Sequence, residues 1–275
     1  MHIFIIKIVR CDKMNYKKLQ DWNSGMHNRI IKRHPNGFIG AVVQGERGQG
    51  KSMYAYKLMA KVYLTLGEYR SLNDGKIHAV TNETEAYQAS LEHMIFSPRE
   101  LIDLFKYNNK NDYVTPILCL DDATVHFNNY KFFVDLYEVI LLKGMFDTIR
   151  TVATGLLLTC PKRRNLLSFL RDYDDLKIEI KQAPGGENHN RYARAYQFNW
   201  YPDDKKYRVI VPFQDKYSVY VPGNKDDPNT PYGAYYAKRK SYNDTVTEKM
   251  DELAREREKR KRKKKQPDLQ PQPNF

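Results

Sequence analysis

The chain has 275 residues, of which 41% are hydrophobic and 13% aromatic, and its formal net charge at pH 7 is +13. This length and apolar content exclude a disordered chain and predict one large domain, or one domain with an appendage. The positive charge predicts an anionic partner, with nucleic acid as the first candidate.

The cysteine content indicates a cytoplasmic protein. Cys11, Cys119 and Cys160 are too few and too widely spaced for a disulfide framework or a metal site. The apolar residues 1–9 are too short to cross a membrane, and no small-residue cleavage site follows them. No membrane association is therefore expected. Residues 1–9 form either an edge strand or additional residues before a start at Met14.

Residues 1–36 are predicted to be an N-terminal extension to the main domain. Within it, residues 16–34 are basic and weakly periodic, which predicts a peripheral helix. Residues 35–37, Pro-Asn-Gly, then predict a turn.

Residues 38–66 predict a strand, a glycine-rich loop and a helix. The apolar run 38–43 is typical of a buried strand, and apolar residues recur at helical spacing from residue 55 to residue 66. Between them, GERGQGKS at residues 45–52 matches the pattern GxxxxGK[ST]. Glycines let main-chain N–H groups approach phosphate oxygens, and the helix directs its positive end toward the same anion. This segment therefore predicts a phosphate-binding loop.

The predicted nucleotide-binding residues are Gly45, Glu46, Arg47, Gly48, Gln49, Gly50, Lys51, Ser52 and Met53. In such a loop, Lys51 reaches the β- and γ-phosphates and the Ser52 hydroxyl binds Mg²⁺. The predicted cofactors are ATP and Mg²⁺. The alternative, a glycine-rich turn that precedes Lys-Ser by chance, is disfavoured by the flanking strand and helix.

The next elements lead to an acidic strand end. Residues 67–76 predict a loop, residues 77–93 a short strand or a helix, and residues 94–97 a short strand. Ser97-Pro98-Arg99-Glu100 is typical of a helix start, because Ser97 caps, Pro98 takes the first helical position and Glu100 completes a capping box. This helix is expected to end between residues 108 and 112.

Residues 116–120 predict a buried parallel strand that ends at Asp121 and Asp122. Ligands of parallel α/β sheets lie beyond the carboxyl ends of the strands, so this pair and the phosphate loop are expected at one edge. Asp121 would bind Mg²⁺ through water, and Asp122 would orient or deprotonate the attacking water. The alternative is a strand that ends in a solvated acidic turn.

Residues 129–182 are predicted to complete the domain. They comprise a helix at 129–146, a strand at 152–158, a helix at 161–173 and an edge strand at 175–181. Thr159, directly after the strand at 152–158, either contacts the γ-phosphate or the attacking water, or caps the helix that Pro161 begins. The resulting order of elements predicts an α/β sandwich around five mainly parallel strands.

Residues 183–222 predict a β-hairpin appendage. Alternation places Tyr192, Arg194, Tyr196, Phe198 and Trp200 on one face. These rings either pack against the sheet or stack on nucleic-acid bases, as interleaved arginines would allow.

Residues 223–275 are predicted to contain a linker, a basic helix and a tail. Residues 223–242 predict the linker, residues 245–261 the helix, and the last ten residues a disordered tail. Residues 255–265 contain nine basic and two acidic side chains, a net charge of +7. They are expected either to contact a nucleic-acid backbone, DNA before RNA, or to be a solvated charged segment.

GERGQGKS (45–52), ILCLDD (117–122) and LLLT (156–159), in this order, resemble P-loop ATPases of the additional-strand type. These are the AAA-like and RecA-like branches, in which the acidic strand is inserted between the phosphate-loop strand and its usual neighbour. More narrowly, the chain is similar to small ATPases of archaeal viruses and plasmids, some of them described as DnaA-like or helicase-loader-like. The resemblance covers residues 37–182, the predicted ATPase core.

The resemblance implies a role for individual residues. Lys51 and Ser52 match the phosphate-loop pair, Asp121 the metal carboxylate and Thr159 the sensor. Arg171 occupies the place of the arginine that reaches the γ-phosphate of a neighbouring subunit, which implies a homo-oligomer. Arg163 and Arg164 are alternatives for that role, and Arg171 could instead cap its helix. The family usually has Glu where this chain has Asp122.

These observations predict a Mg-ATPase that acts on nucleic acid, as a remodeller or helicase loader in the replication of a viral or plasmid element in the host cytoplasm. A HerA/FtsK-like ATPase that translocates or packages DNA is an alternative. A nucleotide-gated DNA-binding protein without hydrolysis is a second alternative, which the replacement of Glu by Asp122 keeps open.

Overall fold

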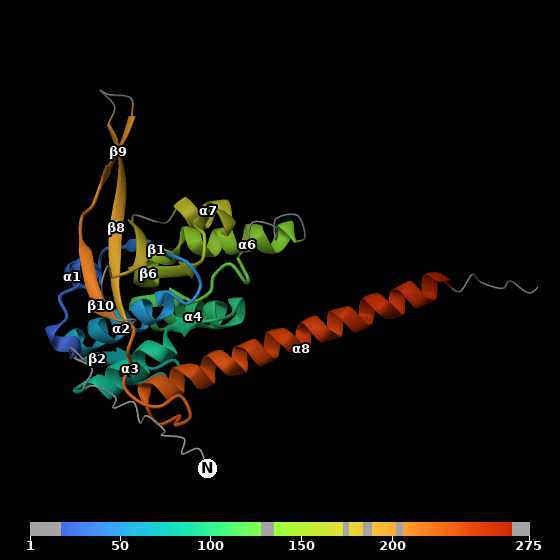
Figure 1. Cartoon of the computed structure of the whole chain (residues 1–275), viewed down its shortest axis with the longest axis horizontal. Helices are drawn as coiled ribbons and strands as arrows, with labels where there is room; N and C mark the ends of the chain where they lie inside the picture. Colours follow the sequence, from blue (N-terminus) through green and yellow to red (C-terminus); the bar gives the residue numbers. More distant parts are fainter. Residues whose placement is uncertain (1–17, 128–134, 173–175, 184–188, 202–205, 266–275) are drawn as a thin grey trace, which may run out of the picture. The chain divides into compact units, whose positions relative to one another are not determined.

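The computed structural model describes residues 18–127, 135–172, 176–183, 189–201 and 206–265 (Figure 1). The chain divides into two compact units, Met1–Val221 and Pro222–Phe275. The helices of the first unit are η1 (Leu19–Asp21), α1 (Gly25–Arg33), α2 (Lys51–Leu66), α3 (Glu83–Glu92), α4 (Pro98–Asn111), α6 (Leu136–Asp147), η2 (Ile149–Thr151), η3 (Arg163–Asn165) and α7 (Ser168–Asp172). Its strands are β1 (Ile39–Gln44), β2 (Glu68–Arg70), β3 (Ile77–Ala79), β4 (Met94–Ile95), β5 (Thr115–Leu120), β6 (Ala153–Cys160), β7 (Leu176–Gln182), β8 (Asn190–Tyr201), β9 (Lys206–Ile210) and β10 (Gln214–Ser218).

The first unit is built on an eight-stranded sheet in the order β10-β8-β7-β1-β6-β5-β4, with β9 paired to β8 (Figure 1). The strands from β7 to β4 are parallel to one another, and β8, β9 and β10 are antiparallel additions. The predicted α/β sandwich around five parallel strands is confirmed. The predicted β-hairpin also forms, and its strands continue the central sheet.

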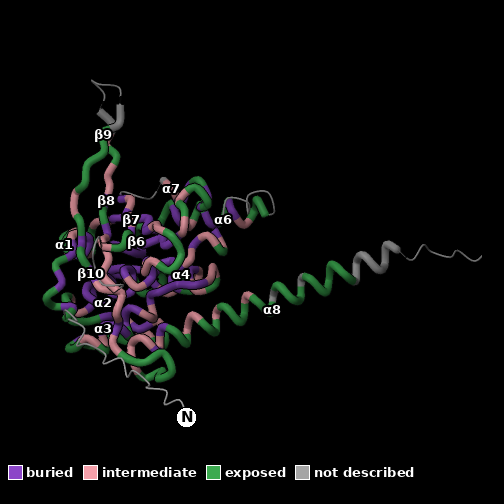
Figure 2. Tube along the Cα trace, in the orientation of Figure 1, coloured by how far each residue is buried: buried purple, intermediate pink, exposed green. Residues whose placement is uncertain are grey.

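Helices cover both faces of the parallel strands, which explains why β5 and β6 are buried along their whole length (Figure 2). One face carries a core to which α4, α6 and α7 contribute Leu101, Leu104, Phe105, Val139, Leu142, Phe146, Phe169 and Leu170. On the other face α1 and α2 contact β1, β5 and β6. Helix α2 is buried on nearly all sides, because α3 packs on it and the Tyr63 hydroxyl donates to the Ile117 carbonyl at 2.9 Å.

The order of the strands differs from the expectation at two points. The strand at 175–181 was predicted at the edge of the sheet, but β7 lies between β1 and β8 and pairs with both, because β8 extends the sheet beyond it. The acidic strand β5 was predicted beside the phosphate-loop strand, but β6 lies between β1 and β5 and pairs with both. Both predictions are wrong. All residues of β6, including Thr154 and Thr159, are buried, as is typical of a strand with neighbours on both sides and helices on both faces.

A buried carboxylate joins α1 to β10. Asp215 accepts hydrogen bonds from the Ser24 hydroxyl at 2.7 Å, the Gly25 amide at 2.8 Å and the Tyr54 hydroxyl at 2.9 Å. Burial raises the pKa of Asp215, while these three donors lower it. Because the Gly25 amide belongs to the first turn of α1, Asp215 satisfies a helix N-terminus that would otherwise be buried without an acceptor.

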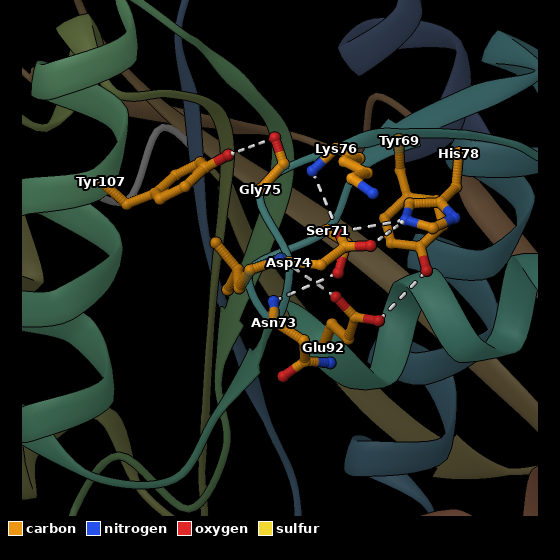
Figure 3. A network of polar contacts seen from close by, with 10 residues as sticks. Tyr69, Ser71, Asn73, Asp74, Gly75, Lys76, His78, Glu92 and Tyr107 are labelled. Carbon is orange, nitrogen blue, oxygen red and sulfur yellow. Dashed lines mark hydrogen bonds and ion pairs between the residues drawn. The ribbon is translucent and has the colours of Figure 1, made fainter.

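A second polar network fixes the β2–β3 ribbon to α3 and α4 (Figure 3). Glu92 of α3 accepts hydrogen bonds from the Tyr69 hydroxyl and from the Leu72 amide, both at 3.1 Å. The Tyr107 hydroxyl of α4 donates to the Gly75 carbonyl at 2.9 Å. Residues 67–93 thus contain two short strands and a helix, where the sequence predicted a loop followed by one strand or helix.

Two segments differ from their predicted secondary structure. The single helix predicted for 161–173 is divided into η3 and α7, because the Leu167 amide donates to the Phe127 carbonyl at 2.9 Å and leaves the helical pattern. The linker predicted for 223–242 is helical from Pro231, where α8 (Pro231–Lys265) begins. The Thr230 hydroxyl accepts from the Gly233 amide at 3.3 Å, so Thr230 caps a helix that Pro231 opens.

Three predictions lie outside the described residues: the strand or upstream segment at 1–9, the start of the helix at 129–134 and the tail at 266–275. In the part of the chain that the structure describes, no helix has the length and apolar character needed to cross a membrane.

The capping box at α4 provides a test of local stability. The Ser97 hydroxyl accepts from the Glu100 amide at 3.3 Å, and the Glu100 carboxylate accepts from the Phe96 amide at 2.7 Å. Ser97→Ala is expected to lower the free energy of unfolding by about 1 kcal/mol, because the Glu100 amide loses its acceptor. Urea denaturation measures this value. Ser97→Thr keeps an acceptor oxygen and should cost less than the alanine; equal costs would contradict the capping role.

Candidate nucleotide-binding site

The loop between β1 and α2 has the backbone of a phosphate-binding loop. Gly48 and Gly50 have φ values of 78° and 87°, in the left-handed region that glycine favours. A Cβ atom on Gly48 would meet nothing within 4 Å, whereas one on Gly50 would collide with Val219. Glu46 and Arg47 are exposed at the loop, and Gln49 and Met53 are half-buried. The loop is therefore open on one side and packed on the other.

Helix α2 differs from its neighbours at its N-terminus. Side chains of Ser24, Asn82, Ser97 and Asp135 cap α1, α3, α4 and α6, but no side chain caps α2, and its first turn contains no acidic residue. The first N–H groups of a helix need acceptors, and its dipole favours an anion there. The start of α2 is thus suited to a phosphate group.

Lys51 and Ser52 are buried in the first turn of α2, with exposed fractions of 7% and 8%. The Lys51 ammonium donates to the carbonyls of Gly45 at 3.0 Å and Glu46 at 2.8 Å. These contacts hold the positive charge against the loop. The predicted lysine therefore lies at the loop itself and is not extended into solvent.

The acidic strand end is joined to Thr159 by two hydrogen bonds. The Thr159 hydroxyl donates to the Asp121 carboxylate at 2.6 Å and accepts from the Asp122 amide at 2.8 Å. Thr159 is fully buried and Asp121 is 3% exposed. Asp122 follows with a φ of 46°, which is uncommon for a residue other than glycine. The hydroxyl of Thr159 is thus used to orient the acidic pair and does not act as a helix cap.

The loop at 45–52 and the Asp121–Thr159 pair lie at the same edge of the sheet. In the parallel register Val43 of β1 is opposite Thr159 of β6, and Leu120 of β5 is opposite Leu158 of β6. Asp121 and Thr159 are therefore level with the end of β1, two residues before Gly45. Because neighbouring strands are about 4.8 Å apart, β6 separates the phosphate-loop strand from the acidic strand by about 10 Å. The prediction that both stretches share an edge is confirmed.

The antiparallel strands support the phosphate loop from its packed side, which the sequence did not indicate. The Tyr217 hydroxyl of β10 donates to the Gly50 carbonyl at 3.1 Å, and Arg191 of β8 donates to the Gln49 carbonyl at 3.1 Å. The Tyr217 ring also packs edge-on to Tyr54 of α2, at 5.1 Å between centroids. These partners are about 140 to 170 residues from the loop in sequence, so no local pattern could identify them.

The buried Lys57 also joins helix α2, which follows the phosphate loop, to the end of β10. Lys57 of α2 donates to the carbonyl of Ser218, the last residue of β10, at 3.0 Å and to that of Tyr220 at 3.1 Å. Burial lowers the pKa of Lys57 to about 8, and the charge of Glu83 partly opposes this shift. Helix α2 and the end of β10 are thus joined by a partly desolvated cation.

Arg171 lies in the short helix α7 and is half-buried. Its carbonyl accepts a hydrogen bond from the Arg163 guanidinium at 2.6 Å. Arg163 therefore caps the C-terminus of α7, where a cationic side chain can bond the last carbonyls of a helix. The role of Arg171 toward a neighbouring subunit stays a prediction.

Sequence comparisons identify a similar protein in an archaeal virus. No protein family model matches this chain. It is 24% identical over 249 residues to the uncharacterized protein B-251 of Sulfolobus spindle-shape virus 1, covering 87% of this chain and 89% of that protein.

Three solved structures are also similar, at low TM-scores. A KaiC-like protein of Pyrococcus horikoshii is 14% identical, with 62% of this chain and 89% of that chain covered and a TM-score of 0.37. The genome packaging NTPase B204 of Sulfolobus turreted icosahedral virus 2, in complex with ATP-gammaS, is 13% identical, with 64% and 98% covered and a TM-score of 0.34. The flagellar accessory protein FlaH of Methanocaldococcus jannaschii is 12% identical, with 68% and 96% covered and a TM-score of 0.33. Scores of this size do not define a function.

Thr159 gives a test of the site. Thr159→Val keeps the shape of the side chain but removes the hydroxyl that orients Asp121 and the Asp122 amide. We expect the Mg²⁺ affinity of the nucleotide complex, or ATP turnover, to fall about 10- to 100-fold, as for other residues that position a metal-binding side chain. The Mg²⁺ dependence of ATP turnover measures this. Thr159→Ser restores the hydroxyl and should restore activity; a serine variant as defective as the valine variant would contradict this role.

Proposed function

We propose that the chain binds Mg-ATP between the phosphate loop and the Asp121–Thr159 pair and hydrolyses it. One observation carries this proposal: an uncapped helix N-terminus with a buried lysine lies at the same sheet edge as a buried, oriented carboxylate. These are complementary parts of a site for a phosphate chain with a divalent cation.

The residues present fit ATP and Mg²⁺ by their chemistry. The N–H groups of the loop and of α2 would bind phosphate oxygens, and Lys51 would exchange its bonds to the Gly45 and Glu46 carbonyls for phosphate. Ser52 and Asp121 supply the hydroxyl and carboxylate oxygens that Mg²⁺ prefers. When bound, Mg²⁺ neutralises charge on the phosphates. Asp122, next to Asp121, would orient or deprotonate the attacking water.

We propose further that the second unit contacts nucleic acid. Residues 255–265 contribute +7 of the net charge of +13 and belong to α8, so their cations are carried on a helix. A helix of 35 residues is about 52 Å long, which can present charge along many phosphates. Contacts of this kind depend strongly on salt and do not read sequence.

The specific role that we propose is a remodeller or helicase loader in the replication of a viral or plasmid element, acting as a homo-oligomer in the host cytoplasm. The similarity to a protein of a Sulfolobus virus supports a mobile-element origin. Apolar side chains exposed on α6, with Tyr137 73%, Ile140 58% and Leu141 52% exposed, support association with another copy. Arg171 is the proposed contact to the neighbouring nucleotide.

The first test is substitution of the phosphate-loop lysine. Lys51→Ala is expected to weaken ATP binding about 10- to 100-fold, because phosphate loses a charged hydrogen-bond donor, and to abolish turnover. Asp122→Asn should keep binding and lose turnover. Isothermal titration with an ATP analogue and a phosphate-release assay measure the two steps. Lys143→Ala, on an exposed ion pair with Asp147, is the matched control. Unchanged activity of Lys51→Ala would reject the site.

The same assays separate the candidate roles. Turnover that DNA stimulates, with directional movement along it, would identify the packaging or translocating alternative. ATP binding without turnover, with or without DNA, would identify a nucleotide-gated DNA-binding protein, to which the shorter carboxylate of Asp122 points. Mass measurement with and without ATP reports the oligomer.

The basic segment gives a separate prediction. Deletion of residues 255–275 should weaken DNA binding and reduce the slope of log K against log salt, since up to nine cations are removed. Fluorescence anisotropy over a salt series measures the slope. Deletion of residues 266–275 alone removes no lysine or arginine and should leave the slope unchanged. An unaltered slope in the longer deletion would exclude the segment from DNA binding.

A further inference from the structure

The antiparallel part of the sheet presents a face that no described helix covers. Along β8, Ala193 and Ala195 are buried, while Arg194 and Phe198 are exposed and Tyr192 and Tyr196 are half-buried. The register places the outward residues of β7 and β10 beside them. The resulting surface, here called the outer face, consists of Lys177, Glu179, Lys181, Tyr192, Arg194, Tyr196, Phe198, Gln214 and Lys216.

Rings and cations are interleaved on the outer face. Tyr192 lies between Lys181 of β7 and Lys216 of β10, and the Lys216 ammonium is 5.6 Å from the ring centroid. Tyr196 is opposite Lys177, whose ammonium is 6.0 Å from that ring. On an extended strand, the two-residue step from Tyr196 to Phe198 spans about 7 Å and the four-residue step from Tyr192 to Tyr196 about 13 Å. The rings of Tyr192, Tyr196 and Phe198 therefore form a row along β8, with cations on both sides.

The charge of the outer face favours an anion. It carries four cations and one carboxylate, Glu179, which already pairs with Lys181 at 3.1 Å and accepts from the Tyr196 hydroxyl at 3.3 Å. Its cations are exposed or half-buried, so a bound strand can reach them. An anion that also has flat apolar groups would use both the cations and the rings.

We propose that the outer face binds single-stranded nucleic acid, with bases stacked on Tyr192, Tyr196 and Phe198 and phosphates near the flanking cations. Unpaired bases stack on aromatic side chains of an open sheet, whereas the bases of a duplex are not accessible to such a surface. This contact differs from that of residues 255–265, which would bind the backbone of either form.

The outer face adjoins the support of the phosphate loop. Tyr192 and Lys216 are directly opposite on β8 and β10, and the next cross-strand pair, Arg191 and Tyr217, donates to the Gln49 and Gly50 carbonyls. Consecutive residues of a strand point to opposite faces. A nucleic acid bound to Tyr192 and Lys216 on the outer face would therefore lie one residue along the strands from Arg191 and Tyr217. These two residues hold the phosphate loop on the opposite face of the sheet. An effect of nucleic-acid binding on the phosphate loop rests on the proposed ATPase function, whereas the binding of nucleic acid to the outer face does not.

The test compares binding of fluorescein-labelled oligo-dT and of a labelled duplex by the full chain, without nucleotide. Tyr192→Leu/Tyr196→Leu should weaken oligo-dT binding on the order of thirtyfold, with little change for the duplex, because two stacking rings are lost. Tyr192→Phe/Tyr196→Phe keeps both rings and should bind as the parent does. Equal weakening in the Leu and Phe variants, or none in the Leu variant, would overturn the proposal.

Exposed cations give a second measurement that does not depend on the rings. Lys177→Gln/Lys216→Gln should weaken oligo-dT binding and reduce the slope of log K against log salt by about 1.4, since each phosphate contact on a single strand contributes about 0.7. Lys106→Gln/Lys110→Gln, on exposed positions of α4, is the charge-matched control and should change the affinity less. Equal effects of the two pairs would overturn the proposal, because they would show only non-specific attraction.

Binding and catalysis can fail separately in these experiments. Ring-dependent binding by a protein without ATP turnover would support the outer face and reject the ATPase. Turnover that depends on Lys51, with oligo-dT affinity unchanged in the Leu variant, would support the ATPase and overturn the outer face. Where both hold, oligo-dT should change the turnover rate of the parent and not that of the Leu variant.

Discussion

The hydrogen bond from Thr159 to Asp121 is the contact on which the geometry of the candidate site depends. It is short, at 2.6 Å, and both partners are buried, so it is made in a medium where the loss of a partner is costly. It can form because β6 is the common neighbour of β1 and β5. The same strand thus fixes the distance between the phosphate loop and the acidic pair and supplies the side chain that orients the pair.

The second constraint is the support of the phosphate loop by strands outside the parallel sheet. The carbonyls of Gln49 and Gly50 accept hydrogen bonds from Arg191 and Tyr217, while Lys57 holds the chain after β10. These bonds hold the two residues that immediately precede α2, whose N-terminus has no side-chain cap. An anion site of this kind needs rigid amides, because reorganisation of the loop would oppose binding.

Features that depend on neighbouring residues could be predicted from the sequence. The loop at 45–52 and the capping box at Ser97 each lie within a few residues, and both form as expected. The order of strands could not be predicted, because parallel strands are joined by helices and their pairing is set by packing over long distances. The division of the helix at Leu167 depends on the Phe127 carbonyl, 40 residues away. The start of α8 is different, since Thr230-Pro231 is a local signal that was available in the sequence.

The outer face of β8 depends both on a local sequence pattern and on long-range packing. A period of two residues predicted that the rings share a face, and the structure adds that the opposite face contacts the loop at 45–52 through Arg191 of β8 and Tyr217 of β10. A strand with one face on the core and one in solvent normally carries polar residues outward, with few aromatic rings. Here the outward residues are rings and cations, and the opposite face of β8 carries Arg191 beside the buried Ala193 and Ala195. These aromatic side chains of β8 therefore lie on the outer face, where the proposed single-stranded nucleic acid would stack.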